Sequence, residues 1–542
     1  MDDVEAALKP VVYYLSYALA AAEYSFYKIP GSAVIARYVK SSHQNDPGRT
    51  LLELLLVIFA ISTLLHSRTR ADKSGRHFIK FTEKEIDELV DEWNPEPLAQ
   101  PLDEDEQADL AAVPVIAGAS GPRPTLVGTG KTVLNLASYN FAGLAGNETI
   151  KDRAIETLRK YGLGSCGPPG FYGTIDVHMD LERDIASFLG TEAAILYSQG
   201  FSTISSVIPA FCKRGDVIVV DRGVNFAIQK GIQISRSTIR WFDHNDLNSL
   251  VEVLEGVEKE RRKRKGPLTR RFIVTEGVFE NDGKMVDLPK LIELKLKYKY
   301  RLILDESFSF GTTGRTGRGL TEFYNIPASQ VDMLVGSVAN GLNSSGGFCA
   351  GSKVVVDHQR INGTSFVFSA AMPALLAVSA SEGIRILQNS PQTGVLERLR
   401  ENVRAVRGVL GGVRCVEIPS CEESAIVHLY IRSSSSEEDQ SYLTTTSAKN
   451  NPTSAQPRNP PTFHIASEER LLQHIVAECL SHGVMVTRAK RLRGQEMVEP
   501  RPSIKLALSA ALKREECVFA ATVIGDAFVR VLEGEGRMGV AK

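Results

Sequence analysis

A short turn in the first half of the chain has the composition of an anion site. Ser198–Phe201 follows the apolar run Ala193–Tyr197 and precedes a helical pattern, so it is expected between a strand and a helix. The first turn of a helix presents free backbone N–H groups, and Gly200 lets an anion approach the backbone closely. The sequence therefore predicts an anion-binding turn at this position.

Three other motifs have simpler explanations. Gly128–Thr132 imitates the end of a phosphate-binding P-loop, but Thr125 stands where the motif needs a glycine. The residues after it predict a strand, so a turn between two strands is expected there. Gly314–Gly319 lacks the GxGxxG spacing. Arg261–Lys265 is typical of the solvated end of a helix, and a nuclear signal is the weaker option.

The composition excludes several classes of protein. The chain has 542 residues, 43% of them hydrophobic, and a formal net charge of -1. This is typical of a globular α/β protein and gives no support for nucleic-acid binding, which needs a basic surface. The seven cysteines are scattered and form no CxxC pair, so they indicate neither a zinc site nor a disulfide framework. We expect reduced thiols in a cytosolic compartment.

The anion-binding turn belongs to a stretch of alternating strand and helix patterns. Buried apolar runs alternate with amphipathic helical runs such as Leu247–Glu260 and Leu288–Tyr298, which predicts a mostly parallel seven-stranded sheet with helices on both faces. We expect a large α/β domain at 131–385 and a smaller α+β domain at 386–542. The expected strands are Ala193–Tyr197, Val217–Asp221, Ile239–Phe242, Phe272–Thr275, Arg301–Asp305, Met333–Gly336 and Gly347–Gly351.

The N-terminal part has a different character. Leu51–Leu65 is an apolar run that predicts a membrane span at about 49–66 within an N-terminal segment, 1–66; a buried core helix is the alternative. Basic residues between 68 and 76 predict a lumenal N-terminus and a cytosolic bulk. An amphipathic or linker arm is expected at 67–130, and a disordered insertion at 433–462.

A series of phrases, in order and with matching spacing, resembles the α-oxoamine synthase family, which uses pyridoxal phosphate on the fold-type I scaffold. The match runs from about residue 132 to 375 and more loosely to the C-terminus. The phrases are Asn135–Leu144, Tyr161–Gly173 with His178 and Glu182, Tyr197–Phe201, His244–Asp246, Thr275–Phe279, Gly317–Gly319, Ser344–Gly347, and Phe368–Ser369 with Pro373.

The resemblance implies how a family site is built. The turn that contains Gly200 would hold the cofactor phosphate, and Asp305 would pair with the pyridinium nitrogen. A solvated acid at the end of a strand is the alternative for Asp305. In this chain both positions are expected to be vestigial, because other family residues are replaced.

The replacements fall on the catalytic positions. Asn340 stands where the family has its Schiff-base lysine, and an amide nitrogen is neither a nucleophile nor a base. Asn225 occupies the position of the histidine that stacks on the cofactor. Phe308 occupies a second histidine position, and Ala370 that of a threonine that reaches the phosphate across the dimer interface. The chain alone is therefore expected to be inactive and to hold no cofactor covalently.

Within the family, these losses and the N-terminal apolar segment resemble the non-catalytic subunit of eukaryotic two-subunit members. The phrases Gly167–Thr174, Arg271–Val274 and Asp357–Arg360 strengthen that similarity. It implies a heterodimer at the endoplasmic reticulum membrane, in which a lysine-bearing partner holds pyridoxal phosphate and condenses L-serine with palmitoyl-CoA to 3-ketosphinganine. Small activating and Orm-type regulatory membrane proteins are further implied partners.

The resemblance also implies that this chain completes its partner's site. The residues expected to contribute are Cys166, Gly167, Tyr172, Gly173, Ser369 and Ala370. Cys166 is equally well explained as a packed thiol. Two other functions stay open, namely a self-sufficient synthase and a membrane scaffold without any part in catalysis. No metal site is expected.

Overall fold

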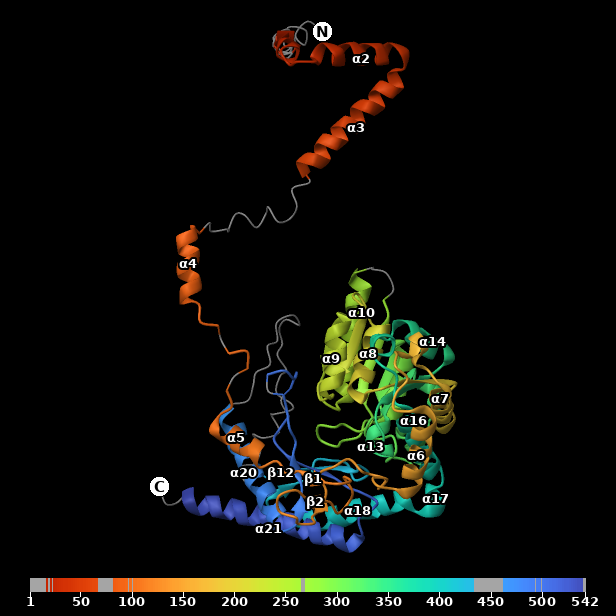
Figure 1. The fold of residues 1–542 in the computed structure, drawn as a ribbon, viewed down its shortest axis with the longest axis vertical. Coiled ribbons are helices and arrows are strands. Elements are labelled where there is room, and N and C mark those ends of the chain that lie inside the picture. The colour runs from red at the N-terminus through yellow and green to blue at the C-terminus, as the bar shows by residue number, and fades with distance from the viewer. Residues whose placement is uncertain are drawn as a thin grey trace. The chain divides into compact units, whose positions relative to one another are not determined.

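The computed structural model describes residues 16–17, 20–21, 23–66, 81–95, 97–99, 101–264, 269–432, 462–492, 494–498 and 500–539. The chain divides into two compact units, Met1–Asp103 and Glu104–Lys542 (Figure 1). The basic cluster at 68–76 lies outside the described residues, and so does the predicted insertion, apart from its last residue. The domain boundary expected at 385/386 stays a prediction.

The N-terminal unit is helical. Its helices include α2 (Ser32–Asn45), α3 (Pro47–His66) and α4 (Glu83–Glu92). Glu53 in α3 accepts hydrogen bonds from Arg49 Nε at 3.0 Å and from Tyr38 Oη of α2 at 3.3 Å.

The predicted membrane span at about 49–66 is not supported by these helices. α3 covers the apolar run as expected, but Glu53 interrupts that run and Arg49 precedes it. Across the described ranges, we find no helix with enough length and apolar character to cross a membrane.

A seven-stranded sheet forms the centre of the larger unit, with the strand order β4-β10-β9-β8-β7-β5-β6. The strands from β6 to β9 are parallel, whereas β10 is antiparallel to both of its neighbours. The predicted sheet is thus confirmed, and each strand lies within two residues of its expected bounds. The strands are β4 (Ala193–Tyr197), β5 (Val217–Asp221), β6 (Thr238–Phe242), β7 (Arg271–Glu276), β8 (Arg301–Asp305), β9 (Met333–Ser337) and β10 (Gly347–Gly351).

Two groups of helices cover this sheet. α8 and α9 pack against each other, and α16 packs against α6 and α7 on the other side of the unit (Figure 1). The helices of this part are α6 (Glu148–Tyr161), α7 (Asp176–Leu189), α8 (Gly200–Phe211), α9 (Phe226–Ser235), α10 (Leu247–Arg264), α11 (Leu288–Tyr298), α12 (Leu320–Phe323), α13 (Val338–Leu342), α14 (Lys353–Asn362), α15 (Thr364–Phe368), α16 (Ala374–Gln388) and α17 (Ser390–Thr393).

The remaining elements form a second, smaller layer. An antiparallel sheet with the order β11-β12-β15-β14 lies beside α18 and α21, which pack against each other. β3 pairs in parallel with β13, so the start of the predicted large domain is joined to the C-terminal part. The elements are α5 (Glu104–Ala111), β1 (Ile116–Ala117), β2 (Thr125–Leu126), β3 (Leu134–Asn135), α18 (Val395–Leu410), β11 (Val416–Glu417), β12 (Ile426–Ile431), α20 (Thr462–Ser481), β13 (Val484–Met485), β14 (Thr487–Arg488), β15 (Ile504–Ala507) and α21 (Arg514–Gly539).

The false P-loop is a turn. Thr125 and Thr132 form an antiparallel bridge across Gly128–Thr132, and Leu126 N donates to Lys131 O at 2.9 Å. A strand, β3, follows the turn instead of a helix. The prediction of a turn between two strands is confirmed.

Candidate functional site

Three adjacent strands end in buried carboxylates. Asp221 ends β5, Glu276 ends β7 and Asp305 ends β8, and each side chain is at most 2% exposed. Because these strands are parallel, their carboxyl ends meet at one edge of the sheet, which is where ligands bind in open α/β folds. Glu276 and Asp305 are direct neighbours in register.

Asn225 holds two of these carboxylates together. It caps the N-terminus of α9, where its Oδ1 accepts a hydrogen bond from Ile228 N at 3.1 Å. Its backbone N donates to Glu276 Oε1 at 2.6 Å, and its Nδ2 donates to Asp305 Oδ2 at 3.2 Å. Asn225, which was predicted to occupy a family histidine position, is therefore a structural clamp within the sheet edge.

Burial changes the acidity of the two neighbouring carboxyls. Removal from water raises the pKa of Glu276 well above its usual range, and the nearby Asp305 and Glu280 add to the rise. Burial also raises the pKa of Asp305, opposed by hydrogen bonds from Ser307 and Asn225. Adjacent buried carboxyls favour a neutral, protonated form for at least one member of the pair.

Asp305 is occupied by contacts within the chain. Ser307 N donates to its Oδ1 at 2.9 Å, while Asn225 Nδ2 engages Oδ2. Both oxygens thus already accept hydrogen bonds. In the family, this carboxylate is expected to face a ring nitrogen, so its local partners here compete with that role.

Asn340 lies close to this carboxylate. It belongs to α13, which is capped by Ser337 through a hydrogen bond from Ala339 N at 3.1 Å. Asn340 Nδ2 donates to Ser307 O at 3.0 Å. The structure therefore brings Asn340 together with Asp305 and Asn225 through Ser307, as the sequence reasoning requires, but its amide is engaged in a backbone contact.

Phe308 is part of an aromatic and charged cluster. The buried ring meets the ring of Tyr139 edge to face, with centroids 5.3 Å apart. Lys505 Nζ donates to Tyr139 Oη and lies 3.3 Å from Glu280 Oε1. Sequence reasoning missed Tyr139, Glu280 and Lys505, because they come together only in the fold.

Gly200 opens α8 at the predicted anion-binding turn. The turn follows β4 directly, and the cap residue, Gln199, makes no side-chain capping bond. A Cβ at Gly200 would lie 3.5 Å from Ser337 Oγ, so this turn lies beside the start of α13. The predicted position between a strand and a helix is confirmed, while anion binding stays a prediction.

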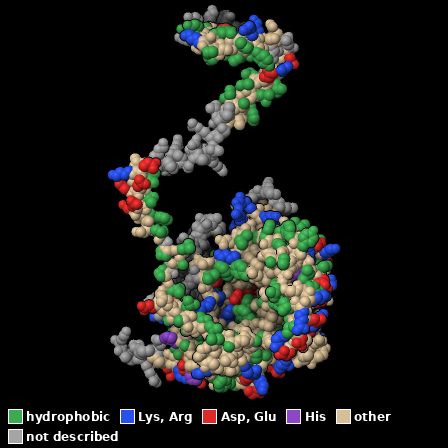
Figure 2. Space-filling view, viewed as in Figure 1, with side chains coloured by type: hydrophobic (Ala, Val, Ile, Leu, Met, Phe, Trp, Pro, Cys, Tyr) green, Lys and Arg blue, Asp and Glu red, His purple; other side chains and the backbone are tan. Residues whose placement is uncertain are grey.

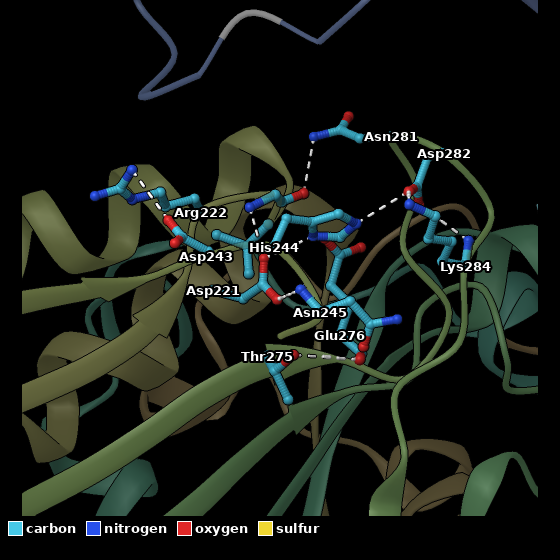
Figure 3. Close-up of polar contacts among 12 residues, drawn as sticks. Asp221, Arg222, Asp243, His244, Asn245, Thr275, Glu276, Asn281, Asp282 and Lys284 are labelled. Carbon is cyan, nitrogen blue, oxygen red and sulfur yellow. Dashed lines mark hydrogen bonds and ion pairs between the residues drawn. The ribbon is translucent and has the colours of Figure 1, made fainter. Parts of the chain in front are cut away.

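A buried imidazole lies between two carboxylates at the same edge (Figure 3). His244 Nδ1 is 2.8 Å from Asp221 Oδ1, and its Nε2 is 3.0 Å from Asp282 Oδ2. Burial alone would lower the pKa of His244, but the two carboxylates outweigh it and raise the pKa to about 10. Lys284 lies 3.4 Å from Asp282. At neutral pH the cluster is a fully paired charge network that fixes the strand ends.

The glycine-rich loop has an unusual backbone. Cys166 and Tyr172 have left-handed φ angles of 59° and 66°, which residues with a side chain rarely adopt. A Cβ at Gly173 would lie 2.1 Å from Gly167 O, so only glycine fits that position. The loop is folded tightly and presents Tyr172 to solvent with its side chain fully exposed.

The same loop touches the second segment expected at a partner's site. Ala371 N donates to Gly167 O at 3.0 Å, which joins the loop to the residues after α15. Ala370 is exposed and Ser369 is half-buried, while Phe368 is 81% exposed. The structure therefore joins the glycine-rich loop, with Cys166, Gly167, Tyr172 and Gly173, to the segment that holds Ser369 and Ala370. Their contribution to a partner's site stays a prediction.

The fold and its strand-end site define a class of protein. Residues 131–458 match the family described as aminotransferase class I and II. The structure is similar to a serine palmitoyltransferase of Sphingomonas wittichii, with a TM-score of 0.65 and 19% identity over 83% of this chain and 99% of that one. It is also similar to 8-amino-7-oxononanoate synthase of Francisella tularensis, with a TM-score of 0.56 and 18% identity over 73% and 97% of the two chains.

The sequence relatives are more specific. The chain is 40% identical to serine palmitoyltransferase 1 of Dictyostelium discoideum, over 88% of this chain and 93% of the relative. It is 38% identical to serine palmitoyltransferase 1 of Saccharomyces cerevisiae, over 90% of both chains. It is 46% identical to long chain base biosynthesis protein 1 of Arabidopsis thaliana, over 65% and 72%. The chain belongs to the family of serine palmitoyltransferase 1 and long chain base biosynthesis protein 1.

The residues at the strand ends do not fit the pyridoxal phosphate that this class of fold uses. Asn340 offers no amine for a covalent bond, and its amide is engaged with Ser307 O. Asp305 is engaged on both oxygens, and Phe308 supplies an apolar ring without a hydrogen-bonding group. No catalytic step can therefore be derived through a cofactor in this chain.

Proposed function

We propose that this chain is the non-catalytic subunit of serine palmitoyltransferase. It supports the condensation of L-serine with palmitoyl-CoA to 3-ketosphinganine on pyridoxal phosphate held by a catalytic partner, the long-chain-base subunit 2. The observation that carries the proposal is Asn340 at the lysine position, with its amide bonded to Ser307 O. The two chains form a heterodimer, to which small activating and Orm-type regulatory membrane proteins are added.

The local contacts support a structural role for the strand ends. Asn225 clamps Glu276 and Asp305, and the charged group of His244 is paired on both sides. These contacts satisfy polar groups that a catalytic site would leave available for substrate. The edge of the sheet therefore stabilises this chain and does no chemistry of its own.

The contribution to the partner comes from the patch around the glycine-rich loop. It consists of Cys166, Gly167, Tyr172, Gly173, Ser369 and Ala370. A strained loop with a fully exposed Tyr172 and an exposed Cys166 suits insertion into another chain, because local strain of this kind is typical of functional segments. The loop would shape the partner's amino-acid site without reacting.

The direct test is an activity assay with the two chains alone and together. We expect no condensation of serine with palmitoyl-CoA by this chain alone, and activity only when the catalytic subunit is present. Turnover by this chain alone would refute the proposal. Activity of the catalytic subunit alone, equal to that of the complex, would leave only the scaffold function.

We also propose that the N-terminal unit holds the chain at the endoplasmic reticulum membrane, with the larger unit in the cytosol. In its support, α3 exposes a run of large apolar side chains, including Leu52, Leu55 and Phe59. The orientation with a lumenal N-terminus is inferred from the basic residues at 68–76. Protease treatment of sealed microsomes tests it: digestion of the larger unit is expected, and its protection would contradict the orientation.

A further inference from the structure

The edge of the central sheet opposite the carboxylates is rich in cations. We call it the amino edge and define it as the starts of β5, β6, β7 and β8 with the ends of the helices that precede them. Figure 2 shows Lys and Arg side chains gathered around the free end of α10. The exposed cations on this edge are Lys213, Arg214, Arg236, Lys259, Arg261, Arg262, Lys263, Arg270, Lys299 and Arg301.

Direct contacts tie the separate parts of this edge together. Ser237 Oγ, just before β6, donates to Lys213 O at 3.0 Å. Asp216 accepts hydrogen bonds from Lys213 N at 2.9 Å and from Arg270 N at 3.1 Å, just before β7. The last turns of α10 also reach β7, because Arg271 Nη1 lies 3.4 Å from Glu258 Oε2. The cations therefore form one surface.

The local carboxylates neutralise only part of this charge. Glu258 pairs with Arg261, Arg262 and Arg271. Asp216 pairs with Arg270. Among the described residues, no ion pair is found for the exposed side chains of Lys213, Arg214, Arg236, Lys259, Lys263 and Lys299. The chain as a whole has a net charge of only -1, so this excess is a local feature.

Stabilisation of helix ends does not account for all of the positive charge on the amino edge. A cation in the last turn of a helix interacts favourably with the helix dipole, and Arg236 and Lys299 cap α9 and α11 in left-handed conformations. One cation per helix end would serve that purpose. The end of α10 instead carries Lys259, Arg261, Arg262 and Lys263, of which two are paired with Glu258. Lys259 and Lys263 remain in addition to Arg236 and Lys299, which exceeds the need of the helix ends.

We propose that the amino edge is an electrostatic docking surface for the anionic headgroups of a membrane. Cytosolic leaflets carry a negative surface potential that attracts clustered Lys and Arg side chains. Nucleic acid is less suitable, because single strands need exposed aromatic rings for stacking. The aromatic residues of this edge are half-buried or buried, as at Tyr298 and Tyr300. The proposal rests on the membrane localisation proposed above.

The test uses the full chain and vesicles of two compositions. The variant changes Lys213, Arg214, Arg236 and Lys263 to Gln. A matched control changes Arg159, Lys160, Lys513 and Arg514 to Gln, which removes the same number and kind of exposed cations from α6 and from the start of α21. Flotation is measured with neutral phosphatidylcholine vesicles and with vesicles that also contain anionic phosphatidylserine, at low and high salt.

We expect the natural chain to bind anionic vesicles more tightly than neutral ones, and this excess to fall with salt. Each cation near an anionic surface contributes up to about five-fold, so two fully engaged cations alone give about 25-fold. The amino-edge variant, which loses four, is therefore expected to lose at least roughly ten-fold of the excess. The control variant is expected to keep it. Binding to neutral vesicles, which reports the N-terminal unit, is expected to be equal in all three proteins.

Four results would overturn the docking surface. The first is an amino-edge variant that still prefers anionic over neutral vesicles as strongly as the natural chain does. If this variant also still binds neutral vesicles, the proposed membrane localisation is unaffected. No binding of the natural chain to either vesicle would reject the localisation as well. If the amino-edge variant bound a polyuridylate RNA more weakly than the natural chain but bound vesicles equally well, the surface would be assigned to nucleic acid. A fall in thermal stability without loss of the excess would leave only the helix-end role.

Discussion

The strand-end site and the glycine-rich loop differ in how their polar and strained groups are used. At the strand ends, Asn225, Asp305 and Asn340 are buried or half-buried and engaged with each other or with the backbone. In the loop, Cys166 and Tyr172 hold strained conformations and face solvent. The strand-end side chains are thus engaged within the chain, whereas the loop holds two strained residues whose side chains are exposed. This contrast is what favours a subunit that serves a partner's site.

The largest expected effect lies in the loop. Gly173→Ala places a Cβ against Gly167 O, and overpacking of this kind costs about 1–3 kcal/mol. We expect the loop to be displaced and kcat/KM of the co-purified complex to fall by roughly ten-fold or more. The matched control is Gly170→Ala, where a Cβ meets no atom within 4 Å. Equal activity of the two variants would mean that the loop shape does not matter.

Enlarging the exposed thiol should have a smaller and more selective effect. Cys166→Trp adds bulk at an exposed position of the loop, so we expect altered serine binding or amino-acid selectivity while the heterodimer still forms. Cys166→Ala is expected to be mild, because little volume changes. The measurement is steady-state kinetics with serine, alanine and glycine. Unchanged kinetics of the Trp variant in an intact heterodimer would reject the shared site.

The pH dependence of stability tests the charge network around His244 at the strand ends. Because the pKa of His244 is raised from 6.5 to about 10, the stability from its two carboxylate pairs is fully present below about pH 6.5 and is lost as the pH rises through about 10. His244→Gln should therefore lower the thermal midpoint most near pH 6.5 and least near pH 10. His474→Gln, at an exposed histidine, is the control and should have little effect. A constant difference across this range would contradict the charge network.

Restoring the lysine alone should have the smallest effect. Asn340→Lys returns an amine to α13, but Asn225 still clamps Asp305 and Phe308 still fills the neighbouring position. We therefore expect no turnover of serine and palmitoyl-CoA by this variant without its partner. Measurable turnover would show that the other replacements are tolerated and that the strand-end site is closer to function than its contacts indicate.

The sequence predicted the sheet well, because each of its strands is a short apolar run between clear helical patterns. The antiparallel direction of β10 could not be predicted in this way, since Gly347–Gly351 is buried on both faces like its parallel neighbours. The Asn225–Asp305 contact was also hidden, because the two residues lie 80 positions apart. The resemblance brought these positions into one site, but only the fold shows that they bond to each other.

The charge networks are the part of the site that the sequence predicted least well. His244 was noted only as part of a family phrase, and its partners lie far from each other in the sequence, Asp221 at the end of β5 and Asp282 in the turn after β7. Tyr139 and Lys505 are more than 300 residues apart in the sequence and meet across the two layers. No local spacing indicates such contacts. The basic run Arg261–Lys265 was visible, but the other cations of the amino edge join it only through the parallel order of the strands.

The central claim is that the cofactor belongs to the partner and not to this chain, and covalent trapping tests it most directly. Borohydride reduction of the co-purified complex, followed by peptide mapping, should yield a stable pyridoxyl adduct on a lysine of the catalytic subunit. Reduction of this chain alone should yield none, since Asn340 has no amine. A pyridoxyl adduct on any residue of the strand-end site of this chain would contradict the account.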